Sequence, residues 1–211
     1  MREIVDRNEI IKPYILNKIV LDIGFLGDNA KLGDVSDFHL FLKQYAKDVL
    51  GIDIEKRKID YLKKKGWNVM YDNAENLINL SRLNKKFDVV VIGETLHYLS
   101  NVGMFLENIK KFLHNESLLI ITLPNPYSLR RIYKYVIKGK FDEPNLTKGS
   151  VMYFTKDQIR RLLWRHNFEI VKIKDTTKRE YSGIKGNIEK LISRILPRFA
   201  SHFLVISKVR K

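Results

Sequence analysis

Polar residues follow four apolar runs of the chain, each at the point where a buried strand is expected to end. Asp22 and Gly24 follow "KIVL", Asp53 follows "VLGI", Asn73 follows "WNVMYD", and Glu94 follows "FDVVVIG". A carboxylate there can accept hydrogen bonds from two ribose hydroxyls, and an amide can hydrogen-bond the edge of an adenine ring. A glycine lets the backbone approach a ligand closely. These residue types therefore predict a pocket for an adenosine-containing cofactor.

Seven apolar runs have the length and composition of strands, and helical patterns lie between most of them. The expected strands are residues 18–24, 49–54, 67–71, 87–93, 117–123, 169–176 and 202–210. The expected helices are residues 37–47, 55–66, 75–83, 102–113 and 154–168. This alternation predicts an α/β fold with a doubly wound, mostly parallel seven-stranded sheet and helices on both faces. We expect the last strand to be antiparallel, because only an insertion separates it from the preceding strand.

The bulk composition fits a single globular domain spanning residues 1–211. The chain contains 45% hydrophobic residues and no cysteine, which excludes disulfides and thiolate metal sites. Its five histidines show no metal-ligand spacing, so no metal site is expected. No apolar run approaches the ~18 residues of a membrane span, and the N-terminus is too charged for a signal peptide. We therefore expect a cytoplasmic protein.

The net charge of +15 is concentrated toward the end of the chain. Residues 126–211 contain 21 Lys and Arg against 7 Asp and Glu, a balance of +14. A basic field attracts anions, and the candidates are nucleic acid, an anionic membrane surface or a phosphorylated small molecule. A solvated surface that aids solubility is the alternative. Because the charge is so one-sided, we expect an anionic partner.

Five motifs, in order, resemble those of the class I S-adenosylmethionine-dependent methyltransferases, including the small-molecule, ubiquinone-type branch. "VLDIG" is similar to the first motif, "VLGIDI" to the second, and "YDNAENL" to the adenine-side motif, with Asn73 where the family usually has Asp. "FDVVVIGETLHYLSN" and "FLENIKKFLHNESLLIITLPNPYS" resemble the central stretch of that branch. The resemblance implies S-adenosylmethionine as cofactor. The cofactor-binding residues that it implies are Asp22, Gly24, Phe25, Gly27, Asp53, Ile54, Asn73, Ala74 and Glu94.

The first motif departs from the family pattern, which has three glycines at alternate positions. Here Leu26 and Asp28 hold the second and third of these positions, and the next helix is expected to begin no earlier than Ser36 or Asp37. S-adenosylmethionine has no pyrophosphate to cradle, so we interpret the loop as a cofactor site of different shape. A relative that has lost cofactor binding is the competing explanation. An NAD enzyme would need G-x-G-x-x-G, which is absent.

The acceptor side of the site is less specific in sequence. His97 and Tyr98 follow the fourth strand and could face the transferred methyl group, with His97 as a general base or simply a surface residue. "LPNPYS" reads as a turn at the substrate entrance, and Tyr127, Arg130 and Arg131 are candidate substrate contacts.

Two basic segments, about 126–150 and 181–200, are expected as lid-like insertions. The second has an apolar stripe that suits an anionic membrane surface or a lipid substrate, or simply packing on the sheet. We therefore expect methyl transfer to a small or lipid-linked, anionic acceptor. The alternatives are an RNA methyltransferase, and a non-catalytic binding module of the same fold. The oligomeric state is left open.

Overall fold

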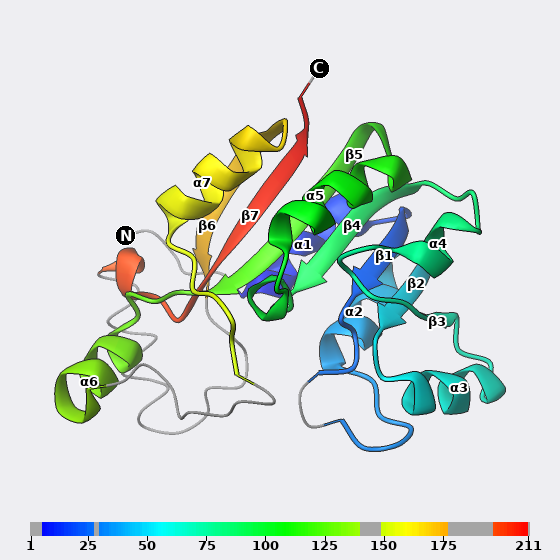
Figure 1. Cartoon of the computed structure of the whole chain (residues 1–211), viewed down its shortest axis with the longest axis horizontal. Coiled ribbons are helices and arrows are strands. Elements are labelled where there is room, and N and C mark those ends of the chain that lie inside the picture. The colour runs from blue at the N-terminus through cyan, green and yellow to red at the C-terminus, as the bar shows by residue number, and fades with distance from the viewer. Residues whose placement is uncertain (1–5, 28–29, 140–148, 177–195, 211) are drawn as a thin grey trace.

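A seven-stranded sheet forms the centre of the computed structural model, which describes residues 6–27, 30–139, 149–176 and 196–210 (Figure 1). Its order is β3-β2-β1-β4-β5-β7-β6. The strands are β1 (Ile19–Ile23), β2 (Asp48–Asp53), β3 (Val69–Tyr71), β4 (Phe87–Gly93), β5 (Leu113–Pro124), β6 (Phe168–Thr176) and β7 (His202–Val209). β1 to β5 pair in parallel, whereas β7 is antiparallel to both β5 and β6. This confirms the predicted α/β sheet and its antiparallel last strand.

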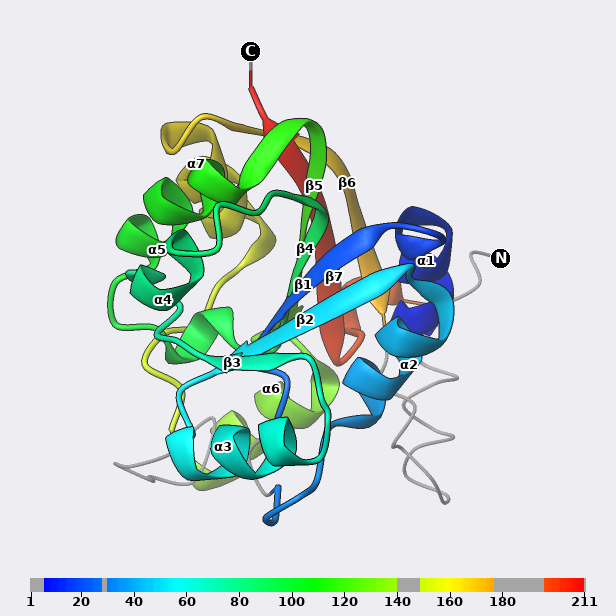
Figure 2. The same cartoon turned by 90° about the vertical axis from the view of Figure 1, so that its right-hand side faces the viewer.

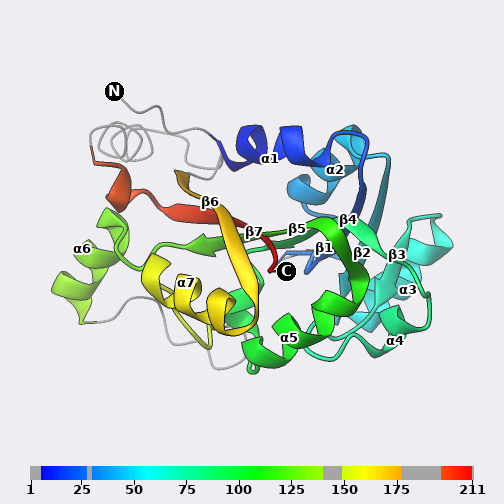
Figure 3. The same ribbon diagram turned by 90° about the horizontal axis from the view of Figure 1, so that it is seen from above.

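Helices cover both faces of the sheet, as Figure 3 shows from above. The helices are α1 (Arg7–Ile15), α2 (Asp37–Tyr45), α3 (Lys56–Lys64), α4 (Ile78–Ser81), α5 (Val102–Ile109), α6 (Leu129–Lys138) and α7 (Lys156–Arg165). α1 and α2 pack on one face over the alternating valines of β1 and β4, and α5 and α7 pack on the other. Each face buries one of the two side-chain sets that alternate along a strand.

Local sequence signals set several helix ends where they were expected. Ser36 caps α2 by accepting a hydrogen bond from the backbone of His39 at 3.2 Å, so the loop before α2 is as long as the sequence indicated. Thr155 and Gln158 form the predicted capping box of α7. Asn167 takes a left-handed conformation, with φ of 59°, and stops that helix.

Two helices were not predicted from the sequence. α1 buries Ile10, Ile11 and Ile15 against the sheet, although Pro13 lies within it. α6 lies in the first of the two expected insertions and has no buried residue. The second insertion, 181–200, falls mostly outside the described residues. Within the part of the chain that the structure describes, no helix is long and apolar enough to cross a membrane.

Candidate functional site

The loop after β1 turns at Gly24 and lies directly against the loop after β4. Gly24 has φ of +76°, and its amide donates to the carbonyl of Ile52 at 2.9 Å. A Cβ on Gly24 would lie 2.1 Å from Oγ1 of Thr95, which is closer than any side chain allows. Gly27 also has a positive φ, +75°, but a Cβ there would meet nothing within 4 Å. Position 24 therefore needs glycine for two reasons, the positive φ and the close approach of Thr95. Position 27 needs glycine only for its positive φ.

Asp53 ends β2 beside this loop and ties the two together. Its Oδ2 accepts a hydrogen bond from the amide of Leu26 at 3.2 Å, and its Oδ1 accepts one from the amide of Ile54 at 2.7 Å. Burial raises the pKa of the Asp53 carboxyl, and the backbone donors oppose that rise. Ile54, next to it, leaves 64% of its surface exposed. The Asp53 carboxylate, which can accept further hydrogen bonds, thus lies beside the exposed apolar side chain of Ile54. An adenosine group needs both, an acceptor for its ribose hydroxyls and apolar surface for its base.

The loop after β3 is fixed by two carboxylates. Asp72 is buried and accepts hydrogen bonds from the amides of Asn73 at 2.9 Å and Leu80 at 2.7 Å. Glu75 accepts from the amides of Ser100 at 2.7 Å and Asn101 at 3.0 Å, which joins this loop to the start of α5. Asn73 stays exposed and Ala74 is buried. The residues predicted for the adenine side therefore stand on a rigid turn, where their contact with a cofactor stays a prediction.

Asp22 and Phe25 point into the protein. Asp22 is fully buried, and its Oδ2 lies 2.8 Å from Nδ1 of His39 on α2. The Phe25 ring is also buried, with its centroid 4.7 Å from that of His39. A Cβ on Gly51 would lie 2.8 Å from Phe25 and 3.0 Å from His39, so β2 closes the same cluster. The side chains of both predicted cofactor residues therefore pack in the protein interior and support the loop. Phe25 has only its backbone available to a ligand.

Glu94 follows β4 in a left-handed conformation, with φ of 53°. Its amide donates to the carbonyl of Thr122 at 3.1 Å, and its Oε1 lies 3.0 Å from Nη1 of Arg7 at the start of α1. Nε2 of His202, at the start of β7, lies 3.7 Å from its Oε2. Three distant parts of the chain thus meet at the end of β4. Neither Arg7 nor His202 was a site residue in the sequence analysis.

His97 is buried, so its interpretation as a surface residue is wrong. Its carbonyl accepts hydrogen bonds from the amides of Val151 at 2.9 Å and Met152 at 3.1 Å. The following residue, Tyr98, has its ring centroid 4.3 Å from that of His97. The segment before α7 therefore crosses the end of β4 and covers His97. This segment contacts the loop after β4 through both of these hydrogen bonds.

The "LPNPYS" stretch is a turn, as the sequence favoured. Asn125 is buried, and its side-chain amide donates to the carbonyls of Arg198 at 2.9 Å and Ala200 at 2.8 Å. Tyr127 is exposed after this turn. The Arg131 guanidinium lies 3.5 Å from the carbonyl of Asn125 and stacks over the Tyr153 ring, with its Cζ 5.9 Å from the centroid.

The candidate substrate residues share an edge with the cofactor residues. Figures 1 and 2 both show α6 on the side of the molecule where β1, β4 and β5 end, which we call the carboxyl edge. α6 follows the end of β5, whereas α3 lies at the other end of this edge. Arg130 and Arg131 therefore do not lie across the molecule from the predicted cofactor pocket, but the described contacts do not bring them to Asp53.

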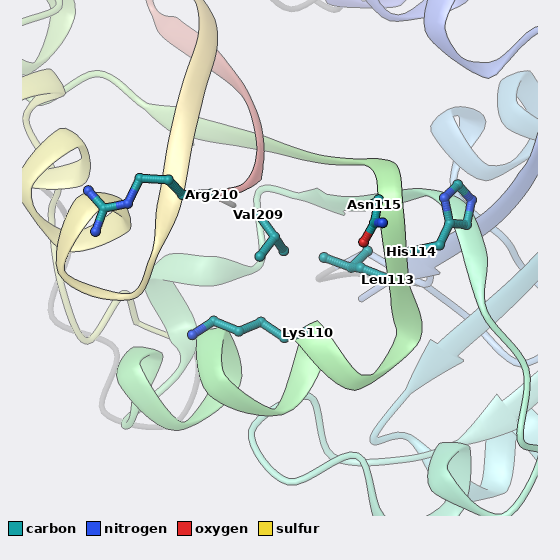
Figure 4. Close-up of a pocket in the computed structure, with 6 residues that line it drawn as sticks. All are labelled: Lys110, Leu113, His114, Asn115, Val209 and Arg210. Carbon is teal, nitrogen blue, oxygen red and sulfur yellow. The ribbon is translucent and has the colours of Figure 1, made fainter.

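A separate cavity of about 240 Å³ lies at the opposite edge of the sheet (Figure 4). Its charged lining groups are engaged elsewhere: Lys110 with Glu107 at 2.8 Å, and His114 with Asp88 at 3.0 Å. Arg210 likewise donates to Asn167 at 3.1 Å. The described residues also contain no group of His, Asp and Glu that could hold a metal ion. The carboxyl edge therefore remains the candidate site.

Comparisons with known proteins agree with this geometry. Residues 17–173 match a family model described as a methyltransferase domain. An S-adenosylmethionine-dependent methyltransferase from Archaeoglobus fulgidus is 20% identical, with a TM-score of 0.59 over 95% of this chain and 94% of that one. A similar structure from Methanosarcina mazei is 19% identical, with a TM-score of 0.59 over 98% and 99%. One from Mesorhizobium loti is 14% identical, with a TM-score of 0.60 over 96% and 95%. No curated protein sequence matches. At these identities the structural likeness shows the fold.

Proposed function

Because the chain belongs to the methyltransferase domain family, with S-adenosylmethionine as cofactor, we propose that its acceptor is a small or lipid-linked molecule bound at the carboxyl edge. The cofactor assignment depends most on Asp53, which ends β2 and is fixed by the amide of Leu26 at 3.2 Å. The residues present fit the cofactor. Asp53 keeps acceptor capacity for ribose hydroxyls, and Ile54 offers exposed apolar surface beside this acid.

The protein contributes mainly position and orientation to the reaction. Bound S-adenosylmethionine supplies an electrophilic methyl carbon on its sulfonium. Asp53 would hold its ribose, and Asn73 and Ala74 would lie at its adenine side, so that the methyl group could pass to an acceptor with the thioether as leaving group and the acceptor proton going to a base or to water. Because the sulfonium is already reactive, holding the acceptor in line is the main requirement. His97 and Tyr98 remain candidates for contact with the acceptor.

The surface of α6 supports a lipid-linked acceptor. Tyr133, Val136 and Ile137 share one face of this helix and are 67%, 71% and 64% exposed. Lys134 and Lys138 lie on the other face, and Arg131 turns toward the protein. A surface helix normally buries its apolar face, whereas α6 presents that face outward. A helix of this kind can lie in the surface of an anionic membrane, with apolar side chains inserted and cations near the lipid headgroups.

The cofactor assignment is tested by thermal unfolding with S-adenosylhomocysteine or NAD. A ligand that binds only the folded state stabilises it, by about 2.7 kcal/mol at a hundredfold excess over its dissociation constant. We expect S-adenosylhomocysteine to raise the melting temperature and NAD to leave it unchanged. Asp53→Ala should remove most of the rise, while Asp48→Ala, at the opposite end of the same strand, should keep it. An equal rise with NAD, or none with either ligand, would contradict the assignment.

Charge keeps RNA as a second candidate acceptor, because the excess of basic residues lies in residues 126–211. Contacts to phosphates release counterions, so RNA affinity that rests on charge alone falls steeply with salt. We expect weak binding that disappears near physiological salt, without RNA methylation. Salt-resistant binding of one particular RNA would reverse this order. A non-catalytic module would bind S-adenosylhomocysteine and transfer no methyl group to any acceptor.

A further inference from the structure

A buried histidine on α2 lies beneath the loop that turns at Gly24. His39 is the third residue of α2 and leaves only 1% of its surface exposed. Its Nδ1 lies 2.8 Å from Oδ2 of Asp22, and its ring centroid lies 4.7 Å from that of Phe25. A Cβ on Gly51 would lie 3.0 Å from its Cε1. This one side chain therefore packs against β1, the loop after β1, and β2.

Hydrogen bonds tie the first turn of α2 to this loop at two levels. An ionised carboxylate only accepts hydrogen bonds, so Nδ1 of His39 donates to Asp22. In the part of the chain that the structure describes, no other group donates to that carboxylate, and a buried carboxylate is costly without a partner. Ser36 accepts from the amide of His39 at 3.2 Å, and its own amide donates to the carbonyl of Phe25 at 3.2 Å. The helix therefore holds both the strand end and the loop.

Side chains packed beneath the loop set its shape at a position where the sequence lacks a glycine. Leu26 replaces that glycine and is buried in a cluster with Phe25 and with Ile59 and Leu62 of α3. Its amide still donates to Oδ2 of Asp53 at 3.2 Å. A displacement of the loop would therefore remove a donor from the acid that we assign to the ribose. The adenosine side of the pocket thus depends on what holds the loop in place.

We propose that His39 is a positioning residue of the cofactor pocket. Through Asp22 and Phe25 it holds the loop after β1 in the conformation that binds the adenosine part of S-adenosylmethionine. This inference rests on the proposed function. The side chain is buried beneath the loop, so it acts on the cofactor only through the loop. A site that is ordered before binding loses less conformational entropy when its ligand arrives. Cofactor affinity therefore depends on His39, although His39 contacts no part of the ligand.

Calorimetric titration of two His39 variants tests this role. His39→Leu removes the donor, whereas His39→Asn keeps it, because Nδ2 of asparagine is attached to the same carbon as Nδ1 of histidine. We expect His39→Leu to weaken S-adenosylhomocysteine roughly 10- to 100-fold and His39→Asn to stay within about threefold of wild type. The ligand 5′-methylthioadenosine, which lacks the amino-acid end, should weaken by the same factor, because the whole loop is displaced.

Leu42→Ala is the matched control for a loss of stability alone. Leu42 is fully buried on the same helix, in the core cluster that α2 shares with α1. Its replacement leaves a cavity and should lower the melting temperature, while the affinities for both ligands stay within about twofold of wild type. A purely structural role of His39 would give the same result as this control.

Unchanged affinity in His39→Leu, no recovery in His39→Asn, or weakening of S-adenosylhomocysteine alone would overturn the inference. If His39→Leu does not fold, hydrogen exchange of the ligand-free wild-type protein decides. The amide of Leu26 should exchange at least about tenfold more slowly than an unstructured amide, because the loop is already in place. Exchange at the unstructured rate would overturn the inference while leaving the proposed function intact. A wild-type protein that binds neither ligand would instead overturn the proposed function.

Discussion

The two ends of the carboxyl edge are built in different ways. At the β1–β4 end, the loops hold one another: Gly24 touches Thr95, Asp53 accepts from Leu26, and Glu75 accepts from Ser100. At the β5 end, α6 follows a firm turn at Asn125 but buries none of its own residues. The first arrangement suits a ligand of constant shape. The second presents a surface, which suits an acceptor that differs among enzymes of one fold.

The net charge also differs between the two parts of the chain that form these ends. Residues 1–125 contain 18 Lys and Arg against 17 Asp and Glu, a balance of +1, whereas residues 126–211 carry +14. A nearly neutral region is suited to a zwitterionic cofactor, whose charges must be matched locally. A strongly cationic region attracts an anionic partner over a distance. The contrast predicts that changes at the β1–β4 end affect folding and cofactor affinity, and that changes at α6 affect the acceptor.

The largest effect is expected where the loops touch. Gly24→Ala combines a left-handed residue with a Cβ 2.1 Å from Thr95, whereas Gly27→Ala has only the left-handed residue. A strained backbone costs about 1 kcal/mol and forced repacking about 2 kcal/mol more. We therefore expect Gly24→Ala to lower the free energy of unfolding by about 3 kcal/mol and Gly27→Ala by about 1 kcal/mol. Denaturant titration measures both, and equal losses would show that the two loops do not constrain each other.

The sequence placed several residues of the β1–β4 end correctly in the fold because they follow strands. A parallel sheet fixes where strands end, so Gly24, Asp53 and Asn73 could be placed at one edge before any contact was known. Arg7 and His39 could not be found this way. Arg7 meets Glu94 across 87 positions and His39 meets Asp22 across 17, and only the packing of α1 and α2 on the sheet creates these pairs.

The β5 end was predicted less well, for two physical reasons. The spacing of Tyr133, Val136 and Ile137 shows which residues share a helix face, but it does not show which face the protein covers. α6 exposes its apolar face, the reverse of the usual arrangement. His97 had two interpretations in sequence, a group facing the methyl or a surface residue. The structure excludes the second, because the side chain is buried and the amides of Val151 and Met152 both donate to its carbonyl.

Cofactor affinity should depend on pH through Asp53. Burial raises the pKa of its carboxyl, and only the ionised form accepts hydrogen bonds from both ribose hydroxyls without a proton of its own. As pH falls through that raised pKa, S-adenosylhomocysteine affinity should fall, by about tenfold per pH unit at most. Calorimetry between neutral and acidic pH measures this change.

The effect of Asp53 on stability has the opposite sign, which provides an internal control. A folded-state pKa above the unfolded one means that the fold favours the protonated carboxyl. Its contribution to stability is therefore full at low pH and is lost as pH rises through the raised pKa. Asp48 contributes stability in the opposite direction, because its hydrogen bond with Lys85 lowers its pKa. Affinity that stays flat while stability changes would exclude Asp53 as the ribose acceptor.

The smallest effect on folding is expected at α6, where it tests the acceptor end directly. Val136 and Ile137 are 71% and 64% exposed, so replacing both with serine should change the free energy of unfolding by no more than about 0.5 kcal/mol. S-adenosylhomocysteine affinity should also stay unchanged. Binding to phosphatidylcholine vesicles that contain phosphatidylglycerol should fall about tenfold, because the helix loses much of the apolar surface that it inserts. Vesicle sedimentation measures that fall.

Two comparison variants make this last prediction a test of the contrast between the two ends. Ile159→Ser, in the fully buried face of α7, should lower the free energy of unfolding by several kcal/mol. It shows the effect of the same kind of substitution at a buried position. Arg130→Ala should weaken vesicle binding only at low salt, since it removes charge and leaves the apolar face intact. If the double serine variant loses 2 kcal/mol or more of stability, the outward face of α6 is covered in solution. The β5 end would then be as firmly packed as the β1–β4 end. That result would contradict both the membrane proposal and the contrast between the two ends.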